Sequence, residues 1–92
     1  MRVDIYSKPK CSLCDKAIDV VEAVRARLPF ELRIISILED PALFTTWRYD
    51  IPVVVINGEP AFKHHVDPDA LEARLREASS GTAVAKSSAQ DG

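Results

Sequence analysis

The order of polar and apolar positions changes early in the chain from a strand pattern to a helix pattern. Residues 2–6 alternate, with Val3 and Ile5 on one face, and this alternation predicts a β-strand. Further on, apolar side chains recur every three or four residues, which predicts one face of a helix that ends at Pro29. That face consists of Cys14, Ile18, Val21, Val24 and Leu28.

A second strand is predicted over residues 32–37, which are rich in β-branched side chains. We expect it to be buried on both faces around Ile34 and Ile35. Two strands joined through a helix form a βαβ unit, whose strands run parallel. Asp40–Pro41 then predicts a short helix, because aspartate caps helix starts and proline suits the first helical position. Its inward-facing side chains are expected to be Leu43, Phe44 and Trp47.

The second half of the chain predicts a hairpin and a last helix. Asn57–Gly58 separates the apolar run 51–56 from residues 59–63, and this dipeptide is typical of a type I′ hairpin turn. Asp67–Pro68 repeats the signature of a helix start. The inner face of this last helix is expected to hold Leu71, Leu75 and Ala78. The order β-α-β-α-β-β-α predicts an α/β fold, with three helices around a mixed four-stranded sheet in which the first strand lies centrally beside the third.

Length and charge narrow the possible classes of protein. The 92 residues fit one domain, which we assign to residues 1–78, and residues 79–92 lack large apolar groups and are predicted to be a disordered tail. The formal net charge of −2 offers nucleic acid no basic face. No apolar run approaches the roughly 20 residues that span a bilayer. Asp4 stands where a signal peptide needs an apolar stretch, so we expect a cytoplasmic protein. We also expect a monomer that has no nucleic-acid or membrane partner.

The candidate chemistry lies at Cys11 and Cys14, a C-x-x-C pair at the junction of the first strand and helix. In a reducing compartment such a pair indicates redox chemistry or metal binding. Cys11 is expected near the helix N-cap and Cys14 in the first turn, close enough for a disulfide. Free backbone N–H groups at a helix start stabilise a thiolate at Cys11 more than at the deeper Cys14, and Lys8 and Lys10 add positive charge.

This arrangement predicts that Cys11 attacks a disulfide and that Cys14 resolves the mixed disulfide. The dithiol would itself be the redox group, so no organic cofactor is required. Structural zinc would need His64 and His65 as well, but neighbouring residues on a strand point to opposite faces, so we expect no metal site. Two inert buried cysteines are the other alternative, which the polar, proline-containing flanks disfavour.

Two segments carry a resemblance to a known family. Tyr6–Cys14, with the sequence YSKPKCSLC, resembles the active-site segment of glutaredoxins, including a lysine, Lys8, three positions before the first cysteine. Tyr49–Val53, with the sequence YDIPV, resembles their segment that carries a cis-proline opposite the dithiol. The likeness runs from about Val3 to Leu75 and is greatest to the small glutaredoxin-like proteins, whose substrates are poorly defined.

The resemblance implies a thioredoxin fold and a thiol–disulfide oxidoreductase that acts on disulfides of proteins or small molecules. It also implies that Pro52 is cis and packs beside the cysteines. The backbone of Ile51 would then face an incoming disulfide and pair with it as a short strand does.

Glutathione is an open question within this resemblance. Glutaredoxins that bind glutathione carry a Gly-Gly pair followed closely by an aspartate before the last helix, where this chain has His64-His65-Val66-Asp67. Two imidazoles would crowd the backbone that glycines leave accessible. Asp67 and Lys8 remain candidate substrate-binding residues, although a helix cap explains Asp67 equally well. The co-substrate is therefore glutathione or a separate reductase.

Three further readings stay open. His64 and His65 are expected to be exposed at a strand end, or one of them reaches the dithiol and transfers a proton. As in some glutaredoxin relatives, Cys11 could bind an iron–sulfur cluster across a dimer, which visible absorbance and iron content would reveal. The domain could instead be a non-catalytic interaction module, in which case a Cys11→Ser variant would keep its cellular role.

Overall fold

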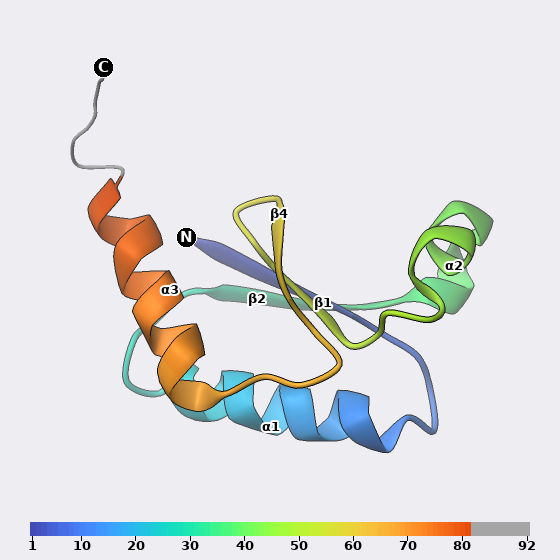
Figure 1. Cartoon of the computed structure of the whole chain (residues 1–92), viewed down its shortest axis with the longest axis horizontal. Coiled ribbons are helices and arrows are strands. Elements are labelled where there is room, and N and C mark those ends of the chain that lie inside the picture. Colours follow the sequence, from blue (N-terminus) through green and yellow to red (C-terminus); the bar gives the residue numbers. More distant parts are fainter. Residues whose placement is uncertain (82–92) are drawn as a thin grey trace.

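The computed structural model of the protein describes residues 1–81, and its elements follow the predicted order (Figure 1). The strands are β1 (Arg2–Ser7), β2 (Glu31–Ser36), β3 (Val53–Ile56) and β4 (Glu59–Lys63). The helices are α1 (Ser12–Arg25), α2 (Pro41–Trp47) and α3 (Pro68–Gly81), with a 3₁₀ turn, η1, at Ile37–Glu39. Within the described residues no helix is both long and apolar enough to cross a bilayer.

The four strands form one mixed sheet in the order β2-β1-β3-β4. β1 pairs in parallel with β2 and antiparallel with β3, and β3 continues into the antiparallel hairpin with β4. The first strand therefore lies beside the third in the middle of the sheet, as predicted. This position explains why Val3 and Ile5 are fully buried.

β2 differs from its prediction. We expected a strand buried on both faces, but β2 pairs only with β1 and forms an edge of the sheet. Ile34 is 48% exposed, and Ile35 is half-buried. β-branched side chains favour extended backbone wherever a strand lies, so their abundance does not distinguish a central strand from an edge strand.

Most apolar side chains gather in one main core between the sheet and the helices α1 and α3. This core joins Val3, Ile5, Val54 and Ile56 of the sheet, Val21 and Val24 of α1, Phe30, and Leu71 and Leu75 of α3. A second, smaller cluster consists of Cys14, Ile37 and Ile51. α2 lies at the end of the molecule away from α3 (Figure 1), and its apolar side chains pack on the smaller cluster.

The predicted caps and turn are confirmed. The carboxylate of Asp40 accepts a hydrogen bond from the amide of Ala42 at 2.9 Å at the start of α2. Asn57 and Gly58 have φ angles of 51° and 88°, the positive values that a type I′ turn requires. α3 continues to Gly81, so the helix extends three residues beyond the domain boundary predicted at Ala78. The rest of the predicted tail, residues 82–92, lies outside the described residues.

A buried carboxylate joins the two neighbouring parallel strands. The side chain of Asp4 on β1 is only 6% exposed and lies 3.0 Å from Nε of Arg33 on β2 and 3.4 Å from Nε of Arg2. The hydrogen bond and charge of Asp4 raise the pKa of Arg33. This ion pair satisfies a charge that burial alone would disfavour.

Candidate functional site

The two cysteines take the places that the sequence predicts at the start of α1. Cys11 is the N-cap, with φ −114° and ψ 105°, and its Sγ accepts a hydrogen bond from the backbone N–H of Cys14 at 3.3 Å. The amide of Asp15 donates to the carbonyl of Cys11 at 3.1 Å. The sulfur of Cys11 thus faces the first N–H groups of the helix, where negative charge is stabilised.

The environment of Cys14 is different. Cys14 is 1% exposed, whereas Cys11 is partly exposed, and both thiols are free. Burial, followed by the hydrogen bond with the Cys11 side chain, raises the pKa of Cys14 from 9.0 to about 11. A backbone hydrogen bond from Lys8 acts in the opposite direction. Cys14 is therefore a protonated thiol at neutral pH, close to a sulfur that solvent can reach.

Aromatic and aliphatic side chains surround this pair. Tyr6 of β1 and Trp47 of α2 stack with ring centroids 5.7 Å apart and an interplanar angle of 23°. The side chains that pack on the cluster of Cys14, Ile37 and Ile51 are Tyr6, Cys11, Leu43, Phe44 and Trp47. Trp47, for which core packing was predicted, is half-buried here.

The Ile51–Pro52 peptide bond is cis, as the resemblance implied. Ile51 is 8% exposed and belongs to the same cluster as Cys14, so the structure brings Cys11, Cys14 and Ile51 together. The amide of Ile51 donates to the carbonyl of Trp47 at 3.2 Å. Among residues 1–81, the carbonyl of Ile51 has no backbone donor outside the regular elements.

The two other candidate substrate-binding residues lie less close to the sulfurs. The side chain of Lys8 is exposed in the turn before α1, and it is the backbone of Lys8 that reaches Cys14. Asp67 lies at the start of α3, where Oδ2 accepts a hydrogen bond from the amide of Ala70 at 2.9 Å. This capping bond was one of the two roles predicted for Asp67, and substrate binding by either residue stays a prediction.

A cation–aromatic surface borders the cluster and was not predicted in this form. The guanidinium of Arg48 lies 5.5 Å from the ring centroid of Phe44 and 4.6 Å from that of Tyr49, which is 77% exposed. Nζ of Lys63 lies 5.8 Å from the ring of Trp47. Phe44 and Trp47 also pack on the cluster of Cys14, Ile37 and Ile51, which we call the Cys14 cluster. The cation–aromatic surface is therefore continuous with this cluster.

The two histidines are exposed, as expected, but their contacts differ. Nε2 of His64 lies 2.9 Å from the carbonyl oxygen of Tyr49. Both histidines line a groove of about 220 Å³ between α1 and the segment before α3. The other residues that line it are Leu13, Lys16, Ala17, Val20 and Val66. Within residues 1–81, no three His, Cys, Asp or Glu side chains are grouped so as to hold a metal ion.

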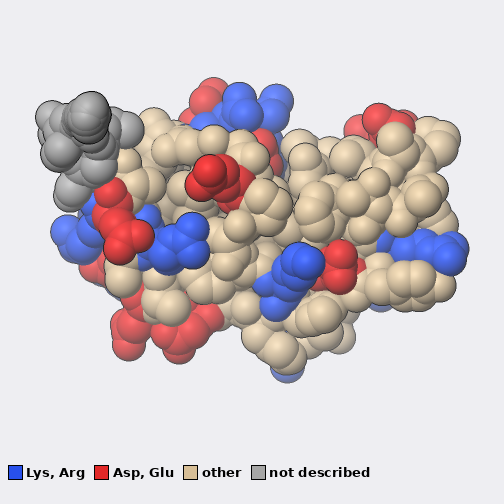
Figure 2. All heavy atoms as spheres, turned by 45° about the horizontal axis from the view of Figure 1, so that its top comes forward, with Lys and Arg blue, Asp and Glu red and all other residues tan. Residues whose placement is uncertain are grey.

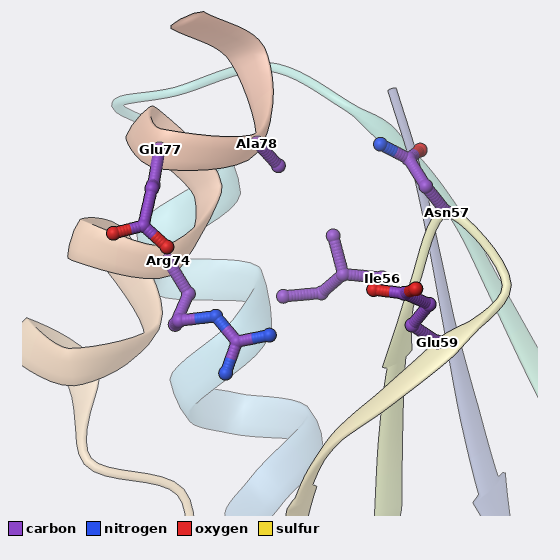
Figure 3. A pocket seen from close by; sticks show the side chains of 6 residues that line it. All are labelled: Ile56, Asn57, Glu59, Arg74, Glu77 and Ala78. Carbon is purple, nitrogen blue, oxygen red and sulfur yellow. The ribbon is translucent and has the colours of Figure 1, made fainter. Parts of the chain in front are cut away.

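A larger cavity, of about 270 Å³, lies elsewhere on the molecule. Figure 3 shows the side chain of Arg74 reaching from α3 toward Ile56, with Asn57 and Glu59 on the hairpin side. None of the residues that line this cavity belongs to the Cys14 cluster. It is therefore separate from the candidate site.

Comparison with known proteins agrees with this geometry. The model of the Glutaredoxin-like domain family (DUF836) matches residues 2–76. The Glutaredoxin-like protein YDR286C homolog of Dictyostelium discoideum is 30% identical over 77 residues, and the match covers 77% of this chain and 71% of that protein.

Solved structures share the fold. The crystal structure of protein XcR50 from X. campestris has a TM-score of 0.70 and 23% identity, over 82% of this chain and 96% of that one. Thioredoxin 1 from Thermosipho africanus has a TM-score of 0.58 and 15% identity, over 86% of this chain and 99% of that one. The fold is therefore thioredoxin-like, and the chain, with its close Cys11–Cys14 pair, belongs to the glutaredoxin-like (DUF836) family.

Proposed function

We propose that the protein is a thiol–disulfide oxidoreductase in which Cys11 is the nucleophile and Cys14 the resolving thiol. The observation that carries this proposal is the asymmetry of the pair. The Cys11 sulfur is accessible and accepts a hydrogen bond from a helix-start amide, whereas burial keeps Cys14 protonated. An attacking thiol needs access and stabilised negative charge, while a resolving thiol has to wait until the first bond has formed.

The reaction balances without a further cofactor. The thiolate of Cys11 attacks one sulfur of the substrate disulfide, a mixed disulfide forms, and the other substrate sulfur leaves as a thiolate that takes up a proton. Cys14 then loses its proton and attacks the Cys11 sulfur, which releases the second substrate thiol. Two electrons pass to the substrate, and the protein is left with a Cys11–Cys14 disulfide.

Formation of the mixed disulfide also removes a cause of the raised Cys14 pKa. In the free protein, the hydrogen bond and the charge of Cys11 both raise the pKa of Cys14. Once Cys11 is covalently bound to substrate, its charge is gone and the thiol of Cys14 is easier to deprotonate. The resolving step is therefore favoured after the first step rather than before it.

The loop at Ile51 and Pro52 is the proposed docking element for the substrate backbone. The amide of Ile51 is already bonded to Trp47, so its carbonyl is the group that would accept a hydrogen bond from a substrate N–H. Lys8 and Asp67 are proposed to contact charged groups of the substrate. Lys8 lies in the turn just before Cys11, and Asp67 caps the start of α3.

The oxidised protein needs a thiol reductant, either glutathione or a dithiol reductase, in a reducing compartment such as the cytoplasm. His64 and His65 line the groove beside Leu13, at the place where the resemblance puts a glutathione site. A protein disulfide that lies across Ile51 has less need of that groove than a tripeptide. We therefore propose proteins as the main substrates, with glutathione or a dithiol reductase as the reductant.

The test is equilibration of the purified protein in graded glutathione redox buffers, followed by acid trapping, thiol alkylation and mass measurement. We expect a reversible Cys11–Cys14 disulfide with a potential between about −270 and −180 mV. A glutathione adduct on Cys11 would identify glutathione as the reductant. Cysteines that stay reduced across the whole range would refute the proposed function.

A further inference from the structure

His64 holds two hydrogen bonds to the short loop that contains Ile51. Its backbone N–H donates to the carbonyl of Pro52 at 2.9 Å, and its ring Nε2 lies 2.9 Å from the carbonyl oxygen of Tyr49. A carbonyl oxygen only accepts, so Nε2 carries the proton in this contact. The two accepting carbonyls flank Ile51, one residue after it and two residues before it.

The backbone of His64 has an uncommon conformation where it makes these two contacts. Its φ angle is 65°, in the left-handed region, which residues other than glycine, asparagine, aspartate and histidine rarely adopt. His64 directly follows Lys63, the last residue of β4, so the chain takes this positive φ where it leaves the strand. The adjacent His65 donates its amide to the carbonyl of Lys63 at 2.7 Å, and its ring has no hydrogen bond recorded within residues 1–81.

The loop has ties on two sides. The amides of Asp50 and Ile51 donate to the carbonyl of Trp47 at 2.8 and 3.2 Å, which holds the loop to the end of α2. On the side of the sheet, Oδ2 of Asp50 lies 3.7 Å from Nζ of Lys63 on β4. His64 adds its two hydrogen bonds on this same side, so the carbonyl of Ile51 is held between α2 and β4.

From these contacts we infer that His64 is a positioning residue, which fixes the Ile51 carbonyl for a substrate backbone. The inference rests on the proposed oxidoreductase function. The ring of His64 makes its contact with Tyr49 and none with either sulfur, so it acts on substrate binding and not on the thiols. Its effect should be confined to substrates that are long enough to lie across Ile51.

Three substitutions separate the ring bond from other effects. His64→Asn keeps a residue that tolerates positive φ, but its amide is too short to reach the Tyr49 carbonyl. His64→Gln places an amide N–H near the position of Nε2 and should restore the bond, although glutamine is less suited than asparagine to the positive φ. His65→Gln is the matched control, because it changes the same side chain one position away. The substrates are insulin, whose disulfides join polypeptide chains, and the small disulfide of 2-mercaptoethanol.

We expect His64→Asn to raise the KM for insulin by roughly two- to tenfold, which corresponds to the loss of one net hydrogen bond. The kcat and the rate with the small disulfide should stay unchanged, and His64→Gln should recover most of the loss. An unchanged KM in His64→Asn, or an equal rise in His65→Gln, would overturn the inference.

A second measurement needs no activity. Amide hydrogen exchange at Asp50 and Ile51 should be faster in His64→Asn than in the wild type, and near wild type in His64→Gln. Equal exchange in all variants would show that the ring does not hold the loop and would refute the inference. Failure of the wild-type protein to reduce either disulfide would instead refute the proposed function, so the two failures are distinguishable.

Discussion

The main core and the Cys14 cluster are both apolar, yet they differ in size and in the side chains that surround them. The main core joins eight buried side chains from the sheet and the helices α1 and α3 with that of Phe30, and most of them are fully buried. The Cys14 cluster has three buried members, and its outer layer of Tyr6, Leu43, Phe44 and Trp47 is only half-buried. The main core is also surrounded by half-buried side chains, but these are mostly aliphatic, whereas three of those around the Cys14 cluster are aromatic.

The surface repeats this contrast. In Figure 2 charged side chains gather toward the α3 end of the visible face, while the α2 end is mostly uncharged. The charges at the α3 end include Glu72, which pairs with Arg27 in the turn after α1 and with Arg76 of α3. The half-buried aromatics and the exposed Tyr49 lie toward the α2 end. The charged ion pairs thus lie toward the α3 end, and the proposed redox pair lies with the aromatic side chains toward the other end.

The comparison is tested most strongly at Cys11. Cys11→Ser removes the proposed nucleophile, and disulfide reduction should fall to below about 1% of the wild-type rate, because a serine hydroxyl is not ionised at neutral pH. The midpoint of urea unfolding should change little, since Cys11 is a partly exposed cap and serine also caps helices. Rates with insulin and urea curves on the same preparations would check both expectations. A variant that retained most of its activity would exclude Cys11 as the nucleophile.

The reverse behaviour is expected in the main core. Leu71→Ala removes a fully buried side chain of α3 and should lower the free energy of unfolding by about 2–5 kcal/mol. The folded fraction should still reduce disulfides at the wild-type rate, because Leu71 packs in the main core and not in the Cys14 cluster. Leu43→Ala, in the half-buried layer of the smaller cluster, is the matched control and should cost less stability. An equal loss for the two variants would remove the distinction between the two regions.

The sequence was sufficient to predict the main core, because its members follow simple periods. The helix stripe of Val21 and Val24, the alternation of Val3 and Ile5, and the turn at Asn57 are local patterns that short segments specify by themselves. The error concerns long-range position, because Ile34 was expected to be buried and composition does not tell an edge strand from a central one. At the chain end, α3 continues past Ala78 to Gly81, because helix propagation does not require apolar residues.

The site was predictable in part. Cys11 and Cys14 stand out by spacing, and their place at a helix start follows from the neighbouring patterns. The contact of His64 with Tyr49 joins residues that are 15 positions apart and depends on a positive φ, so no period or spacing indicates it. The contacts of Arg48 with the rings of Phe44 and Tyr49 likewise depend on how α2 ends.

The buried thiol of Cys14 gives a pH-dependent test of the smaller cluster. Its pKa is raised from 9.0 to about 11 by burial and by Cys11, so the native state holds the proton more tightly than the unfolded chain does. The stabilisation is complete below about pH 9 and is lost as the pH rises toward 11, and the loss is at most about 2–3 kcal/mol. Urea unfolding of the reduced protein from pH 8 to 10.5 would measure it. Cys14→Ala should lack this part of the slope, and an identical slope in that variant would contradict the assignment.

We expect the smallest effect on stability from a substitution at the charged α3 end of the molecule. Glu72 accepts hydrogen bonds from Arg27 at 2.7 Å and from Arg76 at 2.8 Å, which lower the pKa of its carboxylate. The native state therefore releases this proton more easily than the unfolded chain, so the stabilisation is present above the ordinary range of glutamate and disappears as the pH falls through it. Glu72→Gln should lower the urea midpoint slightly at pH 7 and not at pH 3. Added salt should shrink the difference at pH 7, because exposed ion pairs are screened. Glu72 links the turn after α1 to α3 and contacts no residue of the Cys14 cluster, so the rate of disulfide reduction should not change. A change in that rate would show that the two ends of the molecule are coupled.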